Sequence, residues 1–474
     1  MRRWSYGILL LGCVLNGAGR AAGQGLTEMQ KEARAIFQQL IEINTTDSSG
    51  DVTAAAEAMA RRFAEAGFPP SDVHVAGPVA RKKNLVVRFR GTGRRAPVLF
   101  LGHLDVVEAR REDWSLDPFV FVERDGYFYG RGAQDMKQSD AMLVASFLRL
   151  KREGYQPDRD LILALTADEE GGSSNGVDWL LKQHRDWIEA EYCINLDGGE
   201  FEKLHGKRLL ASIQASEKVY ADFEFATENP GGHSSVPEAN NAIYQLAAAL
   251  AKLGNFSFPA RVSEITRNYF KVTARYAEAG LAQDFAGAAA EPPVPSALQH
   301  LSAIPYYNSL LRTTCVATMI SGGHAPNALP QAARANVNCR IFPGDEPEEV
   351  QRTLERVVAD PGVKIKLVEE KTSDGRVIPV VAVPPSPLLP ELTSALRRAV
   401  DPLWPGLPIV PSMSTGASDG KYLRIAGIPT YGISCMFFDM EDNRAHGRDE
   451  RIIVEDFYDG VEFTYRFMKS LSSA

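Results

Sequence analysis

Apolar residues follow two patterns along the chain, and each pattern predicts one kind of element. Apolar residues three or four positions apart, as on one face of a helix, occupy residues 26–43, 52–66, 135–151 and 177–184. Short apolar runs, as in buried strands, occupy residues 84–89, 97–101, 161–166 and 191–196. Helices and strands that alternate in this order predict an α/β domain with a doubly wound, mixed sheet.

The pattern changes in the second half of the chain. Alternation of polar and apolar residues predicts strands at 218–227 and 335–341, and helical periodicity predicts helices at 239–253 and 347–359. These elements are typical of an α+β module. The α/β pattern then resumes after a proline-rich stretch, with predicted helices at 389–400 and 454–470.

We therefore expect two domains, of which the second is inserted into the first. The α/β domain comprises residues 24–211 and 379–474, and the α+β module comprises residues 212–378. Residues 256–303 are rich in alanine and proline with weak periodicity, so an irregular insertion is predicted there.

The first 23 residues have the pattern of an export signal. Arg2 and Arg3 precede a short apolar run, and small residues follow it, which predicts a signal peptide at 1–23 and a periplasmic or secreted protein. A lipid anchor at Cys13 and a retained anchor are alternatives, because Leu10 to Cys13 also resembles the end of a lipoprotein leader. No later segment reaches the roughly 18 apolar residues of a membrane span.

Composition and charge limit the kinds of partner that we expect for this protein. The chain has 474 residues, 45% of them hydrophobic, and a formal net charge of −8, which argues against nucleic acid or an anionic membrane as the main partner. None of the cysteines forms a C-x-x-C pair. Free buried thiols are expected, although an exported protein could pair two of Cys193, Cys315, Cys339 and Cys435.

Three consecutive acids, Asp168, Glu169 and Glu170, end one predicted buried strand. Like charges raise each other's pKa unless a cation or a proton intervenes, and ligands bind at the carboxyl ends of parallel strands. Further candidate groups lie in loops, most of them after predicted strands: His103, Asp105, Asp135, Asp197 and His446. Imidazole and carboxylate ligands together suit Zn²⁺, Co²⁺ or Mn²⁺. A metal-free carboxylate pair, as in glycoside hydrolases, and a non-catalytic binding protein are the alternatives.

Five motifs closely resemble the M20 family of co-catalytic zinc peptidases and amidohydrolases. They are H-x-D-V-V at 103–107, G-R-G-x-x-D-M-K at 130–137, E-E-G at 169–171, G-G-H-S-S at 231–235 and A-H-G-x-x-E at 445–450. The resemblance extends over about residues 28–468 and implies two zinc ions per subunit, with Co²⁺ or Mn²⁺ as alternatives. It also implies a cis peptide bond between Asp135 and Met136.

The resemblance assigns a role to each candidate residue. His103 and Asp197 would bind one zinc ion, Glu170 and His446 the other, and Asp135 both. Glu169 would be the general base, and Asp105 would hold the His103 imidazole in one tautomer. Asp168 has no role in the family pattern and is expected to be solvated or to cap a turn.

The family pattern also implies substrate contacts. Arg340 would bind the substrate carboxylate, with Asn327 and Ser418 as further substrate contacts. His233 would stabilise the oxyanion in a neighbouring active site. In family dimers this histidine comes from the partner subunit, so a homodimer through the inserted domain is expected unless the insertion supplies a histidine in cis.

The implied reaction is hydrolysis of an amide bond next to a free carboxylate. Asp197 stands where other members carry Glu, and Asp is common there among di- and tripeptide hydrolases, so small peptides are the expected substrates. An N-acyl-amino-acid amidohydrolase is the alternative, because some deacylases carry Asp as well.

Overall fold

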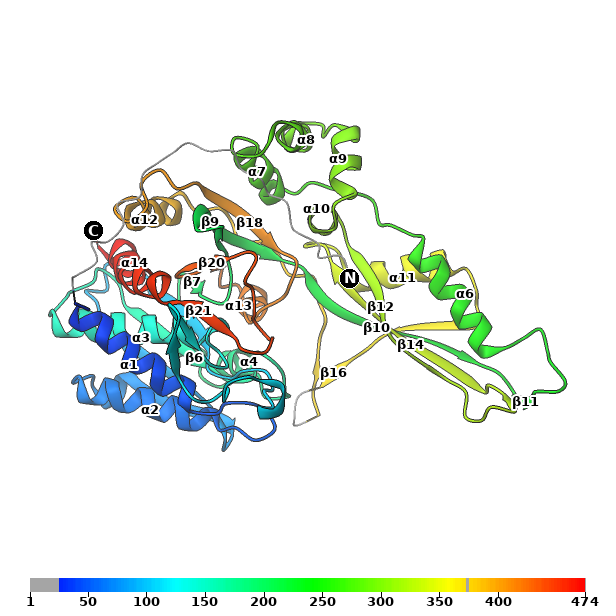
Figure 1. The fold of residues 1–474 in the computed structure, drawn as a ribbon, viewed down its shortest axis with the longest axis horizontal. Coiled ribbons are helices and arrows are strands. Elements are labelled where there is room, and N and C mark those ends of the chain that lie inside the picture. The colour runs from blue at the N-terminus through cyan, green and yellow to red at the C-terminus, as the bar shows by residue number, and fades with distance from the viewer. Residues whose placement is uncertain (1–24, 372–374, 474) are drawn as a thin grey trace.

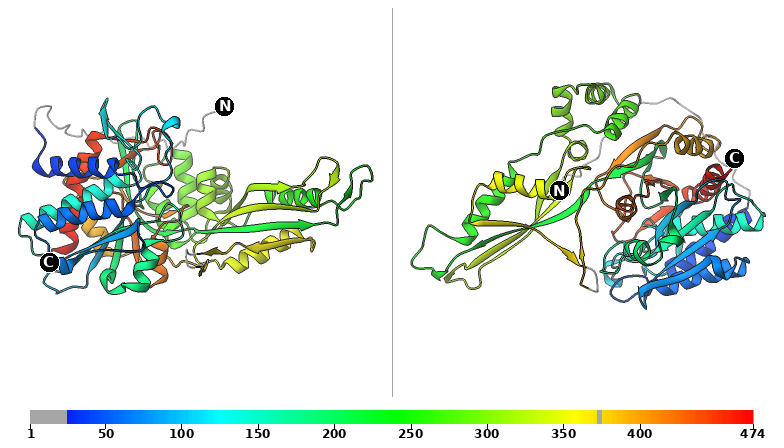
Figure 2. Two further views of the ribbon diagram at one scale, coloured as in Figure 1. Left: turned by 90° about the horizontal axis from the view of Figure 1, so that it is seen from below. Right: turned by 180° about the vertical axis from the view of Figure 1, so that it is seen from behind.

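The computed structural model describes residues 25–371 and 375–473, so the predicted leader, residues 1–23, lies outside the described residues. Figure 1 shows a large body of sheet and helices, formed by both ends of the chain, and an elongated module from the middle of the sequence. The views of Figure 2 show the same two parts. The expected insertion of one α+β module into an α/β domain corresponds to this arrangement.

A mixed sheet forms the centre of the large body. Its strands run in the order β1 (Val73–Val79), β2 (Lys82–Phe89), β6 (Leu161–Thr166), β3 (Val98–His103), β7 (Tyr192–Asn195), β19 (Thr430–Gly432), β9 (Lys207–Glu217), β8 (Phe201–Leu204) and β20 (Phe437–Asp439), and β18 (Ile409–Ser414) also pairs with β9. Strands β6, β3, β7 and β19 are parallel neighbours. The predicted doubly wound α/β domain is confirmed.

Helices cover both faces of this sheet, which is why its central strands β6, β3 and β7 are buried at every position. In β6, Leu163 faces one hydrophobic core and Ile162 faces the other. The first core is covered by α1 (Glu28–Glu42), α2 (Val52–Glu65), α3 (Lys137–Arg152), α12 (Pro390–Val400) and α14 (Val454–Ser472). The second is covered by α4 (Gly176–Gln183), α5 (Arg185–Ile188) and α13 (Gly420–Ile425).

The inserted module has its own sheet and core. Its strands run in the order β12 (Thr314–Gly322), β14 (Ala332–Ile341), β10 (Val219–Glu228) and β15 (Val363–Leu367), with α6 (Ala242–Gly254) and α11 (Pro347–Val358) packed against them. A short two-stranded antiparallel sheet of β11 (Gly232–His233) and β13 (Ala328–Leu329) forms its tip. The boundary expected at residue 211 lies inside β9, which continues to Glu217, so the large sheet extends further than predicted.

Residues 256–303 are not the irregular insertion that was predicted. They form helices α7 (Glu264–Thr273), α8 (Ala279–Ala289) and α9 (Pro295–Ser302), and α10 (Pro305–Leu311) follows. Pro295 and Pro305 start α9 and α10 and do not break them, because the first helical residue needs no N–H group, and the other prolines of this segment lie in loops. Phe270, Phe285 and Tyr307 are buried in the core that also contains residues of the large sheet, so this group of helices packs on the large body.

The structure resolves the open question about the cysteines. Cys315 of β12 and Cys339 of β14 form a disulfide between neighbouring strands, whereas Cys193 and Cys435 are buried free thiols. Among the described residues, no helix has both the length and the apolar character needed to cross a membrane.

Candidate metal centre

Sheet topology brings the predicted metal ligands together. His103 ends β3, whose two parallel neighbours β6 and β7 lead into the loops that carry Glu170 and Asp197. Asp135 lies in the turn before α3, and His446 in the loop before β21 (Arg451–Ile453). Strand β21 pairs with β5 (Tyr127–Tyr129), and this pairing places the loop of His446 beside the turn of Asp135.

Asp135 lies between the two histidines and contacts both. Its Oδ1 is 3.1 Å from Nε2 of His103, and its Oδ2 is 3.1 Å from Nε2 of His446. The same His446 nitrogen is 3.0 Å from Oε1 of Glu170, and Asp197 Oδ1 is 3.8 Å from His103 Nε2. The ligand atoms therefore form two trios that share Asp135, and the atoms of each trio lie within 4.8 Å of one another. This donor set fits two divalent cations bridged by one carboxylate.

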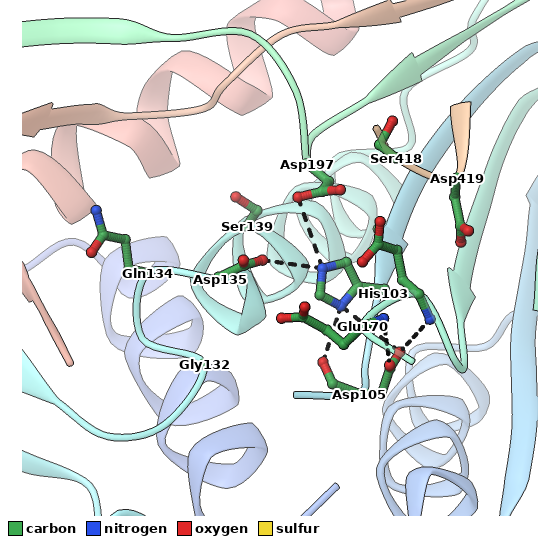
Figure 3. Close-up of polar contacts among 12 residues, drawn as sticks. His103, Asp105, Gly132, Gln134, Asp135, Ser139, Glu170, Asp197, Ser418 and Asp419 are labelled. Carbon is green, nitrogen blue, oxygen red and sulfur yellow. Dashed lines mark hydrogen bonds and ion pairs between the residues drawn. The ribbon is translucent and has the colours of Figure 1, made fainter. Parts of the chain in front are cut away.

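The expected cis peptide bond between Asp135 and Met136 is present. Asp105 holds the His103 imidazole in one tautomer, as expected, and does so through its backbone. Nδ1 of His103 lies 3.0 Å from the backbone carbonyl of Asp105, and its distance to the carboxylate is 3.8 Å. A carbonyl oxygen only accepts hydrogen bonds, so Nδ1 carries the proton and Nε2 is free to bind a metal. The Asp105 carboxylate accepts the backbone N–H groups of Glu169 (3.2 Å) and Glu170 (3.0 Å), and the contact with Glu170 is drawn in Figure 3.

The pKa shifts of the site indicate crowded negative charge that needs a compensating cation. Hydrogen bonds to Asp135 and Glu170 raise the pKa of His446 to about 10. Burial lowers the pKa of His103, but its contacts with Asp135 and Asp197 outweigh burial and raise it well above its usual range. Burial raises the pKa of Asp197 to about 6. Carboxylates this close together need compensating positive charge, which protonated histidines or metal ions can supply.

The three consecutive acids have three different environments. Glu170 contacts His446, whereas Glu169 lines an adjacent cavity, and burial together with nearby Asp197 raises the pKa of Glu169 well above its usual range. Asp168 was expected either to be solvated or to cap a turn, and it is not solvated. It is buried, pairs with Lys82 at 2.7 Å and accepts the backbone N–H of Ser174, so it fixes the loop after β6.

One residue of the site was missed at the sequence level. Glu450 is fully buried, and its two carboxylate oxygens accept hydrogen bonds from the Arg131 guanidinium and from the backbone N–H groups of Gly132, Gln134 and Asp135. It thereby holds the loop that presents Asp135 to the metal centre. The only signal in the sequence was its place as the last letter of the A-H-G-x-x-E motif.

A cavity of about 690 Å³ adjoins the metal centre at Glu169 and Glu170. Arg340 lies in its wall, with its guanidinium 4.7 Å from the centre of the Tyr220 ring. Ser418 also lines this cavity, but its hydroxyl donates to buried Glu217 at 2.9 Å, so its proton is engaged within the protein.

His233 and Asn327 are not brought to the metal centre of their own chain. Both are exposed and lie at or beside the two-stranded sheet of β11 and β13, where the backbone N–H of Ser234 donates to the Asn327 carbonyl. In Figure 1 this small sheet is at the end of the inserted module furthest from the large body.

Comparison with known proteins agrees with this geometry. Residues 99–470 match the profile of peptidase family M20/M25/M40. The chain belongs to this family. As an M20 member it is a metallopeptidase or amidohydrolase that acts on peptide or linear amide bonds.

Two M20 relatives illustrate the range of the family. Probable carboxypeptidase S-like 2 of Dictyostelium discoideum is 27% identical over 419 residues, which cover 86% of this chain and 78% of that protein. Human N-fatty-acyl-amino acid synthase/hydrolase PM20D1 is 28% identical over 395 residues, which cover 79% of this chain and 74% of that protein.

Solved M20 structures share the fold. A metallo-carboxypeptidase from Sulfolobus solfataricus superposes with a TM-score of 0.67 at 16% identity and covers 93% of this chain and 99% of its own. Human carnosine dipeptidase 1 has a TM-score of 0.64 at 15% identity and covers 94% of this chain and 97% of its own.

Proposed function

We propose that this M20 hydrolase binds two divalent metal ions, preferably Zn²⁺, and cleaves the amide bond of an N-acyl-amino acid with a free carboxylate. The observation that carries the proposal is the position of Asp135. Its two carboxylate oxygens each contact one histidine, beside a cavity lined by Glu169 and Arg340. Two metal ions, when bound, supply Lewis acidity at the scissile carbonyl and lower the pKa of the attacking water.

The residues of this chain have separable tasks in the proposed reaction. Glu169 takes a proton from the attacking water and delivers it to the leaving nitrogen, and it lines the cavity beside the metal centre. The Arg340 guanidinium binds the substrate carboxylate in the cavity on the Glu169 side. The metal ligands hold the scissile bond between these two groups.

A second cavity favours an acyl group over a peptide on the other side of the scissile bond. Its volume is about 470 Å³, it adjoins Asp135 and Asp197, and its wall is largely apolar, including Leu196, Ile304 and Phe438. An apolar wall suits an aliphatic chain. The name of the human relative, an N-fatty-acyl-amino acid synthase/hydrolase, agrees with this choice. A carboxypeptidase or dipeptidase is the second candidate, favoured by Asp197 and by the name of the Dictyostelium relative.

A substrate panel tests the proposal. Metal-reconstituted protein should hydrolyse N-octanoyl-phenylalanine faster than N-acetyl-phenylalanine or a dipeptide, and C-terminally amidated analogues should react poorly. Dialysis against EDTA should abolish activity, and Zn²⁺ or Co²⁺ should restore it. Activity that is indifferent to chelation would contradict the metal centre, and faster cleavage of dipeptides would favour the second candidate.

We also propose export. The leader lies outside the described residues, but the disulfide between Cys315 and Cys339 supports an oxidising compartment. Mass spectrometry of the mature protein should find an N-terminus near residue 24, or a lipidated N-terminus at Cys13 if the lipoprotein alternative is right. An intact Met1 in the mature protein would contradict both forms of processing.

A homodimer through the inserted module is the last part of the proposal. Strand β12 is the edge of its sheet, and Val316, Met319 and Ile320 on this strand are more than half exposed, at 60%, 71% and 66%. Tyr244 of the neighbouring helix α6 is 70% exposed. An apolar edge strand of this kind supports pairing with a second copy, which would give His233 a route to the partner's active site.

Mixing two inactive variants tests the dimer. His233→Ala and Glu169→Ala should each be inactive, but their mixture after subunit exchange should regain about a quarter of wild-type activity, because half of the dimers hold one complete site. Ile320→Glu should yield a monomer in light scattering. A wild-type monomer, or a mixture without activity, would contradict a histidine supplied by the partner.

A further inference from the structure

The apolar cavity beside the metal centre contains two buried polar groups that are not needed for amide hydrolysis. Glu202 of β8 is 8% exposed and Tyr307 of α10 is 2% exposed, and both line this cavity of about 470 Å³. Among the described residues, Oε2 of Glu202 and the hydroxyl of Tyr307 have no hydrogen-bond partner. Buried polar atoms without partners are costly, so a cavity with such a pair is suited to a ligand that satisfies them.

The chemistry of these two groups selects the kind of ligand. Burial, together with nearby Glu200, raises the pKa of Glu202 well above its usual range. A protonated carboxyl group and a phenol hydroxyl can each donate or accept a hydrogen bond, so both groups suit a hydroxyl or an ammonium group as partner.

The position of the pair within the cavity sets where the ligand group must be. Asp135 and Asp197 form the part of the wall at the metal centre, and Leu196, Ile304 and Phe438 are apolar parts of the same wall. Neither Glu202 nor Tyr307 belongs to the two trios of candidate metal ligands. We therefore place their ligand group on the bound chain, away from the carboxyl group at the metal centre.

We propose that this cavity binds the acyl part of the substrate and that Glu202 and Tyr307 recognise a hydrogen-bond donor, a hydroxyl or an ammonium group, on the distal part of the acyl chain. This inference rests on the proposed function, because it presumes that the acyl group lies on the Asp197 side of the metal centre. A site that hydrogen-bonds one substrate group discriminates strongly against an analogue without it, since its own polar atoms are then left unpaired.

Binding of product acids tests the inference without catalysis. Calorimetry on the zinc-reconstituted mature protein would compare octanoate, 8-hydroxyoctanoate and 8-aminooctanoate. Wild type should bind at least one of the two substituted acids on the order of tenfold to a hundredfold more tightly than octanoate, because octanoate leaves the buried polar atoms of Glu202 and Tyr307 unpaired. The two substituted acids distinguish a hydroxyl from an ammonium ligand.

Variants connect the preference to the two residues. Glu202→Leu should abolish the preference, and the milder Glu202→Gln and Tyr307→Phe should reduce it while octanoate still binds. Glu228→Leu, an exposed glutamate of β10, is the matched control and should behave as wild type. Equal binding of the three acids by wild type, or a preference that survives Glu202→Leu, would overturn the inference.

Hydrolysis of the three corresponding N-acyl-phenylalanines separates this inference from the proposed function. If all three are hydrolysed at equal rates, the proposed function stands and the distal recognition is wrong. If none is hydrolysed although the binding preference is present and sensitive to Glu202→Leu, the polar site stands and the proposed reaction is wrong.

Discussion

The burial of Glu450 leads to a prediction for Glu450→Gln. Oε1 accepts the N–H groups of Gln134 (2.6 Å) and Asp135 (3.0 Å), and Oε2 accepts Arg131 (2.7 Å) and the N–H of Gly132 (3.1 Å). Glutamine offers one acceptor oxygen, so in either orientation its NH₂ group faces two donors. Two buried donors then lose their partners.

The magnitude follows from these four contacts. Each unsatisfied buried donor costs about 1–3 kcal/mol, so Glu450→Gln should lower the free energy of unfolding by about 2–6 kcal/mol. The same change loosens the loop of Asp135, which bridges the two ligand trios. Displacing a supporting group of this kind lowers metal affinity by on the order of 10- to 100-fold.

Two measurements check the prediction. Urea unfolding of the metal-free protein gives the stability change, and competition with a chromophoric chelator gives the zinc affinity. Glu455→Gln, an exposed glutamate at the start of α14, is the matched control. If Glu450→Gln unfolds within about 0.5 kcal/mol of wild type and keeps its zinc affinity, the carboxylate does not hold the loop.

Three further predictions concern Glu169 with His446, Arg340, and Lys218. Glu169→Ala should retain metal but lose kcat by orders of magnitude, whereas His446→Ala should lose metal first; equal metal loss in both, measured by atomic spectrometry, would refute the separate roles. Arg340→Lys should raise KM for substrates with a free carboxylate more than for amidated ones, and equal KM changes would remove Arg340 from carboxylate binding. Burial lowers the pKa of Lys218 to about 7, so the unfolded chain binds more protons between pH 7 and the usual lysine pKa. Stability should therefore rise with pH across this window, and Lys218→Met should flatten the rise in urea unfolding, whereas an unchanged pH profile would count against a depressed lysine.

The sequence was sufficient to predict the helices and strands that have a clear apolar pattern, and also the candidate metal ligands. The strands and helices of the large sheet carry clear apolar runs, and the ligands follow those strands, so the alternation of elements placed them at one edge. The helices between 256 and 303 were missed because proline ordinarily indicates a break in a helix, whereas Pro295 starts α9 and the other prolines lie in the loops between helices.

Contacts that depend on the exact backbone path were not predictable. Asp105 was expected to hold the His103 imidazole, but nothing in the sequence showed that its backbone carbonyl would do so. Asp168 caps the loop after β6, one of two expectations for it, but its buried partner Lys82, far away in sequence, was not predictable. The spacing of residues in the sequence indicates which residue types gather at a site. The orientation of their side chains depends on loops, whose sequences show no periodic pattern.

The junction of the two sheets has a consequence for substrate length. Strand β9 of the large sheet ends at Glu217 and β10 of the inserted module begins at Val219, so Lys218 is the one residue between them. Tyr220 of β10 pairs in register with Arg340 of β14. The dihedral angles of Lys218 therefore help to set the distance from the carboxylate-binding arginine to Glu169. If Arg340 binds the substrate carboxylate as proposed, the length of the amino-acid half that fits between Arg340 and Glu169 depends on this single residue of main chain.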